Sequence, residues 1–90
     1  MLKIEISKRA EKFIRKLPAK QKRQIITKIM SLRLNSEPHD SIQLKGHDFY
    51  RRTDIGEYRI IYYVRESVVL IILLVGKRNH DEVYKQLKRI

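Results

Sequence analysis

The sequence predicts an α+β domain in which an N-terminal strand and a two-helix hairpin pack on an antiparallel β-sheet, with a short helix at the C-terminus. The main observation behind this class is a change of hydrophobic period. Apolar residues recur at helical spacing as far as residue 34, whereas from residue 41 they alternate, and β-branched and aromatic residues become common. The second observation is size, because 90 residues can build one modest core and no stretch has the composition of a linker. We therefore expect a single domain over residues 1–90.

The N-terminal third predicts a strand followed by two helices. Leu2, Ile4 and Ile6 alternate with polar residues as in a half-buried strand, and Ser7 then offers a hydroxyl to cap a helix. That helix should end before Pro18, and its apolar face consists of Ala10, Phe13, Ile14 and Leu17. A second helix should hold Pro18 in its first turn. Its apolar residues at helical spacing are Ile25, Ile26, Ile29, Met30 and either Leu32 or Leu34.

The remainder of the chain predicts a meander of antiparallel strands near residues 42–45, 49–54, 57–65 and 67–75, with Glu66 and Ser67 as a tight turn. The run from Val68 to Val75 is apolar at every position, which predicts an interior strand covered on both faces. Two helices can cover only one face of a sheet. The other face should be covered either by another chain or by the C-terminal segment folding back.

The C-terminal segment predicts a short helix. Asn79 and, three residues later, Glu82 resemble a capping box. Val83, Leu87 and Ile90 should form the buried face of this helix. Tyr84 then lies about 100° around the helix from Val83, at the edge of that face and near Arg78.

Composition narrows the class of protein. The chain has no cysteine, which excludes disulfides and metal sites with thiolate ligands. Its N-terminus lacks the apolar segment of a signal peptide. The longest apolar run is far shorter than the roughly 18 residues that cross a bilayer. We expect a soluble, cytoplasmic protein that has no membrane partner.

The net charge of +11, from 21 basic and 10 acidic residues, predicts a polyanionic partner such as nucleic acid. Between residues 8 and 33 the only acid is Glu11, so the cations there would repel one another unless phosphates screened them. The alternative is a solvated helix face that only keeps the protein soluble. The residues expected to contact RNA are Lys8, Arg9, Lys12, Arg15, Lys16, Lys20, Lys22, Arg23, Lys45 and Lys77.

Most catalytic signatures are missing from the sequence. His39, His47 and His80 lie in different segments and lack the spacing of a helical metal site, so we expect neither a metal nor another cofactor. What remains is a group of arginines and tyrosines on the sheet and at its end: Tyr50, Arg51, Arg52, Tyr58, Arg59, Arg78 and Tyr84. Arg59 shares a strand face with apolar residues, and Arg78 precedes a helix N-terminus, so both are expected to need an anion. A bound phosphate would supply the anion for both arginines.

The segments Gly56-Glu57-Tyr58-Arg59-Ile60-Ile61-Tyr62, Val75-Gly76-Lys77-Arg78 and Glu82-Val83-Tyr84, at this spacing, closely resemble the RelE group of the RelE/ParE toxin superfamily. The resemblance spans nearly the whole chain. It implies a toxin of a toxin–antitoxin pair that enters the ribosomal A site and cuts messenger RNA there without a metal. The implied partners are a cognate antitoxin and the ribosome, through ribosomal RNA and A-site messenger.

When the family's functional residues are matched to these motifs, the resemblance implies that Arg59, Arg78 and Tyr84 form the catalytic site. Arg51 or Arg52 would assist from the preceding strand. Asp54 departs from the family, since many relatives have a cation there, and this leaves the general base unassigned. The expected reaction is attack of a 2′-hydroxyl on the adjacent phosphate, with arginines binding the phosphate. Two alternatives stay open: a ParE-like inhibitor of DNA gyrase on the same fold, and a plain nucleic-acid-binding module.

Overall fold

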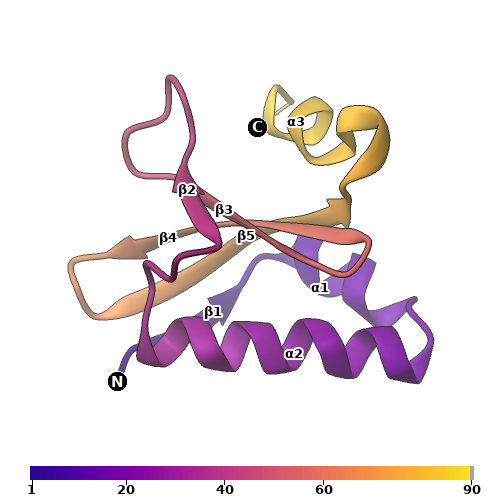
Figure 1. Cartoon of the computed structure of the whole chain (residues 1–90), viewed down its shortest axis with the longest axis horizontal. Coiled ribbons are helices and arrows are strands. Elements are labelled where there is room, and N and C mark those ends of the chain that lie inside the picture. Colours follow the sequence, from indigo (N-terminus) through magenta and orange to yellow (C-terminus); the bar gives the residue numbers. More distant parts are fainter. Residues whose placement is uncertain (90) are drawn as a thin grey trace.

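A five-stranded sheet with helices on both faces forms the protein (Figure 1). The computed structural model describes residues 1–89, except for the side chain of His80. Ile90, predicted on the buried face of the last helix, lies outside the described residues. The elements in chain order are β1 (Lys3–Ile6), α1 (Lys8–Arg15), α2 (Ala19–Leu34), β2 (Ser41–Gln43), β3 (Arg51–Ile55), β4 (Tyr58–Arg65), β5 (Val69–Lys77), the 3-10 turn η1 (Asn79–Asp81) and α3 (Glu82–Leu87). The predicted α+β class is confirmed.

The strands lie in the order β1-β5-β4-β3-β2. The four strands from β2 to β5 form the predicted antiparallel meander, whereas β1 pairs in parallel with β5, Lys3 opposite Val69. Glu66 and Ser67 both have positive φ, 54° and 59°, as the predicted tight turn between β4 and β5 requires. This turn displaces the start of β5 to Val69, and the strand then continues two residues beyond the predicted end at residue 75.

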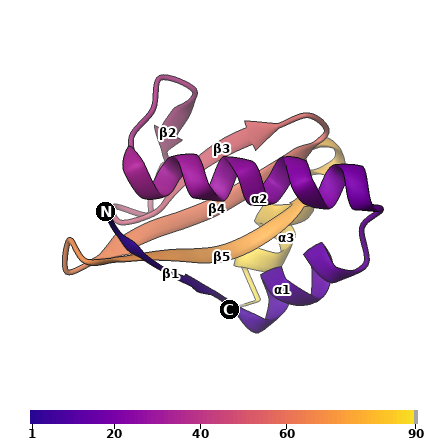
Figure 2. The same ribbon diagram turned by 90° about the horizontal axis from the view of Figure 1, so that it is seen from below.

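The helical hairpin of α1 and α2 covers one face of the sheet, and Figure 2 shows α2 running across it. Ser7 caps α1 as predicted, because its Oγ accepts a hydrogen bond from the Ala10 amide at 3.0 Å. On α2 the buried residues are Ile25, Ile29 and Leu32, which decides between Leu32 and Leu34 in favour of Leu32. Ile26 and Met30, predicted to share that apolar face, are partly exposed instead. Pro18 precedes α2 as its N-cap, one residue before the predicted position.

The opposite face of the sheet is covered by α3 (Figure 1). Val83 is fully buried against Ile61 and Leu74, and Leu87 packs at the edge of the same cluster. Gly76 permits this close approach, because a Cβ at that position would lie 2.9 Å from Cγ1 of Val83. Of the two predicted covers for this face, the C-terminal segment is therefore the one that the structure contains.

The predicted capping box at Asn79 is wrong. Asn79 begins η1, and α3 starts three residues later, after Asp81 in the left-handed region at φ 51°. The Glu82 carboxylate accepts a hydrogen bond from the backbone of Lys77 at 3.4 Å and not from that of Asn79. The intervening 3-10 turn is the physical reason, because it moves the start of the helix past the proposed cap. No helix within residues 1–89 has both the length and the apolar character needed to cross a membrane.

Candidate active site

The candidate site is built on an ion pair between neighbouring strands. Asp54 on β3 lies directly opposite Arg59 on β4, so their side chains project from the same face of the sheet. Arg59 donates from Nε to Asp54 Oδ1 at 2.7 Å and from Nη2 to Oδ2 at 3.2 Å. Gly56, in the turn that joins the two strands, has φ 57°, a conformation that glycine adopts without steric cost.

Arg78 reaches the same carboxylate from the end of β5. Its Nη1 lies 3.8 Å from Asp54 Oδ2, and its side chain is 54% exposed. The position is set by the backbone, because the Arg78 amide donates to the Glu57 carbonyl at 3.0 Å and so ties the end of β5 to the β3–β4 turn. Arg78 therefore presents a solvent-accessible guanidinium beside the partly buried pair of Arg59 and Asp54.

Tyr84 reaches Arg59 from α3. Arg59 Nη1 donates to the Tyr84 hydroxyl at 3.4 Å, and the guanidinium carbon lies 5.6 Å from the centroid of the Tyr84 ring. The seating of Val83 on Gly76 fixes where α3, and with it Tyr84, meets the sheet. Asp54 and Arg59, on neighbouring strands, thus meet Arg78 and Tyr84, which follow β5 in the sequence.

Electrostatics holds this site in its ionised form. The hydrogen bonds from Arg59 lower the pKa of Asp54, with further contributions from the charges of Arg59, Arg52 and Arg78. The same hydrogen bonds raise the pKa of Arg59. We expected Arg59 and Arg78 to need a bound phosphate; the structure supplies the anion from within the chain, as the carboxylate of Asp54. We call Arg52, Arg59 and Arg78 around Asp54 the arginine cluster.

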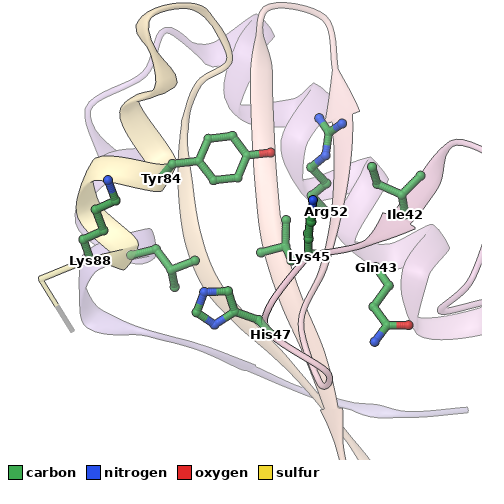
Figure 3. A pocket seen from close by; sticks show the side chains of 9 residues that line it. Ile42, Gln43, Lys45, His47, Arg52, Tyr84 and Lys88 are labelled. Atoms are coloured by element: carbon green, nitrogen blue, oxygen red, sulfur yellow. The ribbon is translucent and has the colours of Figure 1, made fainter.

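The structure separates the two arginines of β3. Arg52 lies opposite Ile61 and projects from the face that carries α3, where it lines a cavity of about 450 Å³ together with Tyr84 (Figure 3). Arg51 belongs to the other face: its Nη2 donates to Ser41 Oγ at 2.9 Å, and its Nη1 lies 3.4 Å from Glu37. Arg51 therefore anchors β2 and the loop before it, and it is not brought together with the other predicted site residues.

The cavity beside Tyr84 lies between α3 and the segment that leads from β2 into β3. We call it the Tyr84 cavity. In Figure 3, Tyr84 and Lys88 extend from α3, while the remaining labelled side chains come from the sheet and the loop. Its lining residues are Ile42, Gln43, Leu44, Lys45, His47, Arg52, Tyr84, Leu87 and Lys88. Gln43, His47 and Lys88 had not been predicted to belong to a binding site. The basic residues Lys85, Lys88 and Arg89 are the sequence signal that could have indicated Lys88 as a binding residue on the C-terminal helix.

The predicted RNA-contacting residues are distributed over several surfaces. Arg9, Lys12 and Lys16 line a groove between α1 and α3 to which Lys85 and Arg89 also contribute. Lys20 and Arg23 line a second groove, beside α2. Lys45 lines the Tyr84 cavity, and Lys77 ends β5. Of the remaining predicted residues, Lys8 and Arg15 are exposed on α1, and Lys22 is partly buried on α2.

The donor set of the site is unsuited to a divalent cation. The arginine cluster offers one carboxylate, already paired with guanidinium groups, and cations repel a metal ion. Within the part of the chain that the structure describes, no three His, Cys, Asp or Glu side chains gather in a way that could hold a metal.

Comparisons with known proteins identify the fold and the family. The chain is 27% identical to a chain of the archaeal RelE–RelB complex from Pyrococcus horikoshii OT3, over 88% of this chain and 97% of that one, with a TM-score of 0.76. It is 26% identical to a mutant of the E. coli toxin RelE in the free state, over 99% of this chain and 97% of that one, with a TM-score of 0.80. The RelB–RelE complex from Methanococcus jannaschii, at 21% identity, shares the fold with a TM-score of 0.70 and coverage of 96% and 98%.

A search of curated protein sequences finds no match. A family model described as "ParE toxin of type II toxin-antitoxin system, parDE" matches residues 4–82. That match spans most of the chain, and it agrees with the similarity to solved RelE toxins. The chain therefore belongs to the ParE toxin family of type II toxin–antitoxin systems, within the RelE/ParE superfamily.

Proposed function

We propose that the chain is a metal-independent endoribonuclease that cuts messenger RNA in the ribosomal A site. The observation that carries this proposal is the convergence of Arg52, Arg59, Arg78 and Tyr84 around Asp54 and beside one cavity, on the face of the sheet that carries α3. Guanidinium groups form bidentate hydrogen bonds with a phosphate and stabilise the negative charge that develops on it during cleavage. The site thus has the groups needed for transesterification of RNA.

In the proposed reaction, the 2′-oxygen attacks the adjacent phosphorus and the bond from phosphorus to the 5′-oxygen breaks. The proton of the 2′-hydroxyl passes to a base, and the departing 5′-oxygen gains a proton. The products are a 2′,3′-cyclic phosphate, which hydrolysis converts to a 3′-phosphate, and a 5′-hydroxyl. Arg59 and Arg78 hold the scissile phosphate, Arg52 assists, and Tyr84 positions the RNA from α3 and is close enough to Arg59 to share in proton transfer.

The ribosome contributes what this site lacks. Asp54, the carboxylate nearest the cluster, has a lowered pKa and is therefore a weak base. We propose that the ribosome aligns the 2′-hydroxyl with the phosphate and that ribosomal RNA binds the exposed cations of the α1–α2 hairpin. A net charge of +11 supports this partner.

A cognate antitoxin is the second proposed partner. The similar chains from Pyrococcus horikoshii and Methanococcus jannaschii were solved in RelE–RelB complexes. Their shared fold supports an antitoxin that binds this chain and keeps its arginines from RNA.

The test is cleavage of messenger on purified ribosomes by wild type, Arg78→Ala and Tyr84→Phe. Both variants should lose at least about 100-fold in rate, as expected when groups that contact the transition state are removed. Arg65→Ala is the matched control, because Arg65 is an exposed arginine paired with Glu5 at the other end of β4. Unchanged circular dichroism verifies folding. Cleavage that persists in both variants would refute the site.

The family model favours a second candidate, inhibition of DNA gyrase, because the proteins it describes are ParE toxins. Inducing the chain in cells separates the two functions. Cut messenger and halted translation support the ribonuclease, whereas accumulated DNA breaks with intact messenger support gyrase inhibition. RNA binding without either lesion would leave a plain nucleic-acid-binding module.

A further inference from the structure

We propose that Asp54 is a specificity-determining residue, whose carboxylate occupies the phosphate-binding edge of Arg59 in the free protein and must be displaced before RNA can bind there. Free RNA therefore binds weakly, whereas messenger that the ribosome holds in place displaces the carboxylate. This inference rests on the proposed function, which supplies RNA as the ligand. It goes further by naming the group that selects ribosome-bound over free RNA.

All three nitrogen atoms of the Arg59 guanidinium already have partners within the chain. Nε and Nη2, which form one edge of the group, donate to the two carboxylate oxygens of Asp54 at 2.7 and 3.2 Å. Nη1 donates to the Tyr84 hydroxyl at 3.4 Å. Bidentate binding of a phosphate requires two N–H groups on one edge of the guanidinium. The edge formed by Nε and Nη2 is therefore blocked until Asp54 leaves it.

The Asp54 carboxylate also lies between Arg59 and Arg78. Its Oδ2 atom accepts from Arg59 Nη2 and lies 3.8 Å from Arg78 Nη1. The proposed reaction gives this same position, in contact with both arginines, to the scissile phosphate. A phosphate and a carboxylate cannot share it, because both are anions and both need the same donors. Asp54 thus acts as an internal substitute for the substrate phosphate.

A small cavity beside Asp54 has room for the displaced carboxylate. Its volume is about 120 Å³, well above the roughly 10 to 15 Å³ that one water molecule requires, and its lining residues are Asp40, Ile42, Arg52, Thr53 and Asp54. Arg52 would be the new partner, since its charge already acts on Asp54. Asp40, the second acid of the lining, is neutralised by an ion pair with Lys28. The Asp54 side chain is 32% exposed and that of Arg59 only 15%, so the carboxylate has more freedom to move than the guanidinium.

Displacement of Asp54 costs binding free energy, and the two kinds of RNA differ in whether they supply it. On the ribosome, the exposed cations of the α1–α2 hairpin contribute binding energy away from the scissile phosphate. Once the ribosomal complex is saturated, weaker binding at one phosphate no longer lowers the rate. Free RNA binds below saturation, so its cleavage falls with the fraction of molecules in which Asp54 is displaced. The carboxylate therefore suppresses the cleavage of free RNA selectively.

Cleavage on purified ribosomes in the presence of a free competitor tests this selection. The competitor is a 2′-O-methyl RNA with the sequence of the messenger, which binds but has no 2′-hydroxyl to react. Its inhibition constant should be at least about fourfold lower for Asp54→Asn than for wild type, because one partly exposed negative charge beside the phosphate is removed. The kcat on saturating ribosomes should stay within about twofold of wild type.

Two control variants separate the charge of Asp54 from its shape and from net charge. Asp54→Glu keeps a carboxylate at the same strand position, and its inhibition constant should lie within about twofold of wild type. Glu5→Gln removes an exposed acid that pairs with Arg65 outside the arginine cluster, and it should also behave as wild type does.

Three outcomes would overturn the proposal. In the first, Asp54→Asn binds the competitor no more tightly than Glu5→Gln does. In the second, Asp54→Glu binds it as tightly as Asp54→Asn, so that charge is not the cause. In the third, Asp54→Asn loses about 100-fold or more in kcat, which would place Asp54 in the chemical step as a proton acceptor.

NMR of the arginine side chains distinguishes failure of this inference from failure of the proposed function, because it requires no cleavage. In isotope-labelled wild type, inorganic phosphate should shift the Nε–H signal of Arg78 but not that of Arg59, whereas in Asp54→Asn both signals should shift together. If wild type cuts messenger but both signals already shift in it, the inference is wrong and the nuclease stands. If wild type cuts nothing while Asp54 still keeps phosphate from Arg59, the nuclease is wrong and the blocking by Asp54 stands.

Discussion

Asp54→Asn removes the one negative charge of the arginine cluster while nearly preserving the shape of the side chain. In the wild type, this carboxylate lies against Arg59 and 3.8 Å from Arg78, where a substrate phosphate would otherwise bind. The protein therefore competes with its own ligand for the two guanidinium groups. We expect the variant to bind phosphate-containing ligands more tightly and to be less stable.

The size of the binding effect follows from Coulomb's law. A phosphate on the same guanidinium would lie about 5 Å from the carboxylate, and effective dielectric constants of about 40 to 80 give a repulsion of about 0.8 to 1.7 kcal/mol. These dielectric constants are appropriate because the Asp54 side chain is 32% exposed. Removing the repulsion should tighten binding about 4- to 16-fold.

The cost in folding stability is smaller than the two hydrogen bonds suggest. Hydrogen bonds to charged groups contribute about 1.5 to 3 kcal/mol when buried. Partial exposure of Asp54 screens them, and asparagine keeps one acceptor for Arg59. We expect the free energy of unfolding to fall by about 1 kcal/mol in Asp54→Asn.

Titration calorimetry with a non-cleavable 2′-O-methyl dinucleotide measures the affinity, and urea denaturation measures the stability. Glu5→Gln is the control, because it also raises the net charge by one while breaking an ion pair, with Arg65, at an exposed site outside the cluster. It should change the affinity less than twofold, on the order expected for a screened distant charge. An affinity in Asp54→Asn that equals or falls below that of Glu5→Gln would refute the competition between Asp54 and phosphate.

Three further predictions concern stability. Gly76→Ala places a methyl group 2.9 Å from Val83 Cγ1, which should displace α3. We expect the free energy of unfolding, measured in urea, to fall by about 1 to 3 kcal/mol. A variant as stable as wild type would show that α3 moves freely on the sheet. Replacing Glu66-Ser67 by Asn-Gly, which favours positive φ at both positions, should raise the melting temperature by several degrees, on the order of 1 kcal/mol, and no rise would contradict the assigned turn. Folding lowers the pKa of Asp54, so the stabilisation by its carboxylate is complete above the unfolded pKa of about 3.9 and is lost as the pH falls through the folded pKa. Below about pH 4, the free energy of unfolding should therefore fall less steeply with decreasing pH in Asp54→Asn than in the wild type. Equal slopes of unfolding free energy against pH would be inconsistent with the lowered pKa.

Most of the fold could be predicted from the sequence because it depends on local periodicity. The apolar faces of α1 and α2 and the turn at Glu66-Ser67 are encoded by neighbouring residues. The parallel pairing of β1 with β5 joins residues 66 positions apart, as Lys3 opposite Val69 illustrates, and no local pattern indicates it. The start of α3 was misplaced for a related reason, since η1 has few sequence signals of its own.

The grouping of the candidate site residues was predictable where a motif specified them, and unpredictable where it depended on the register between strands. Arg59, Arg78 and Tyr84 occupy motif positions, and the structure brings them to one place. Arg51 and Arg52 differ by one residue, which in a strand means opposite faces, so only the observed pairing with β4 separates them. The bond between Asp54 and Arg59 likewise depends on a cross-strand register that the sequence does not specify.

The parallel pair of β1 and β5 bears on how the chain is made. The first strand lies at the edge of the sheet, and its partner β5 runs from Val69 to Lys77. During synthesis β1 therefore cannot pair until β5 has been translated and has left the exit tunnel. The arginine cluster depends on the same late segment, because Arg78 and Tyr84 follow β5. A nascent chain whose β5 is still in the exit tunnel therefore has no assembled arginine cluster.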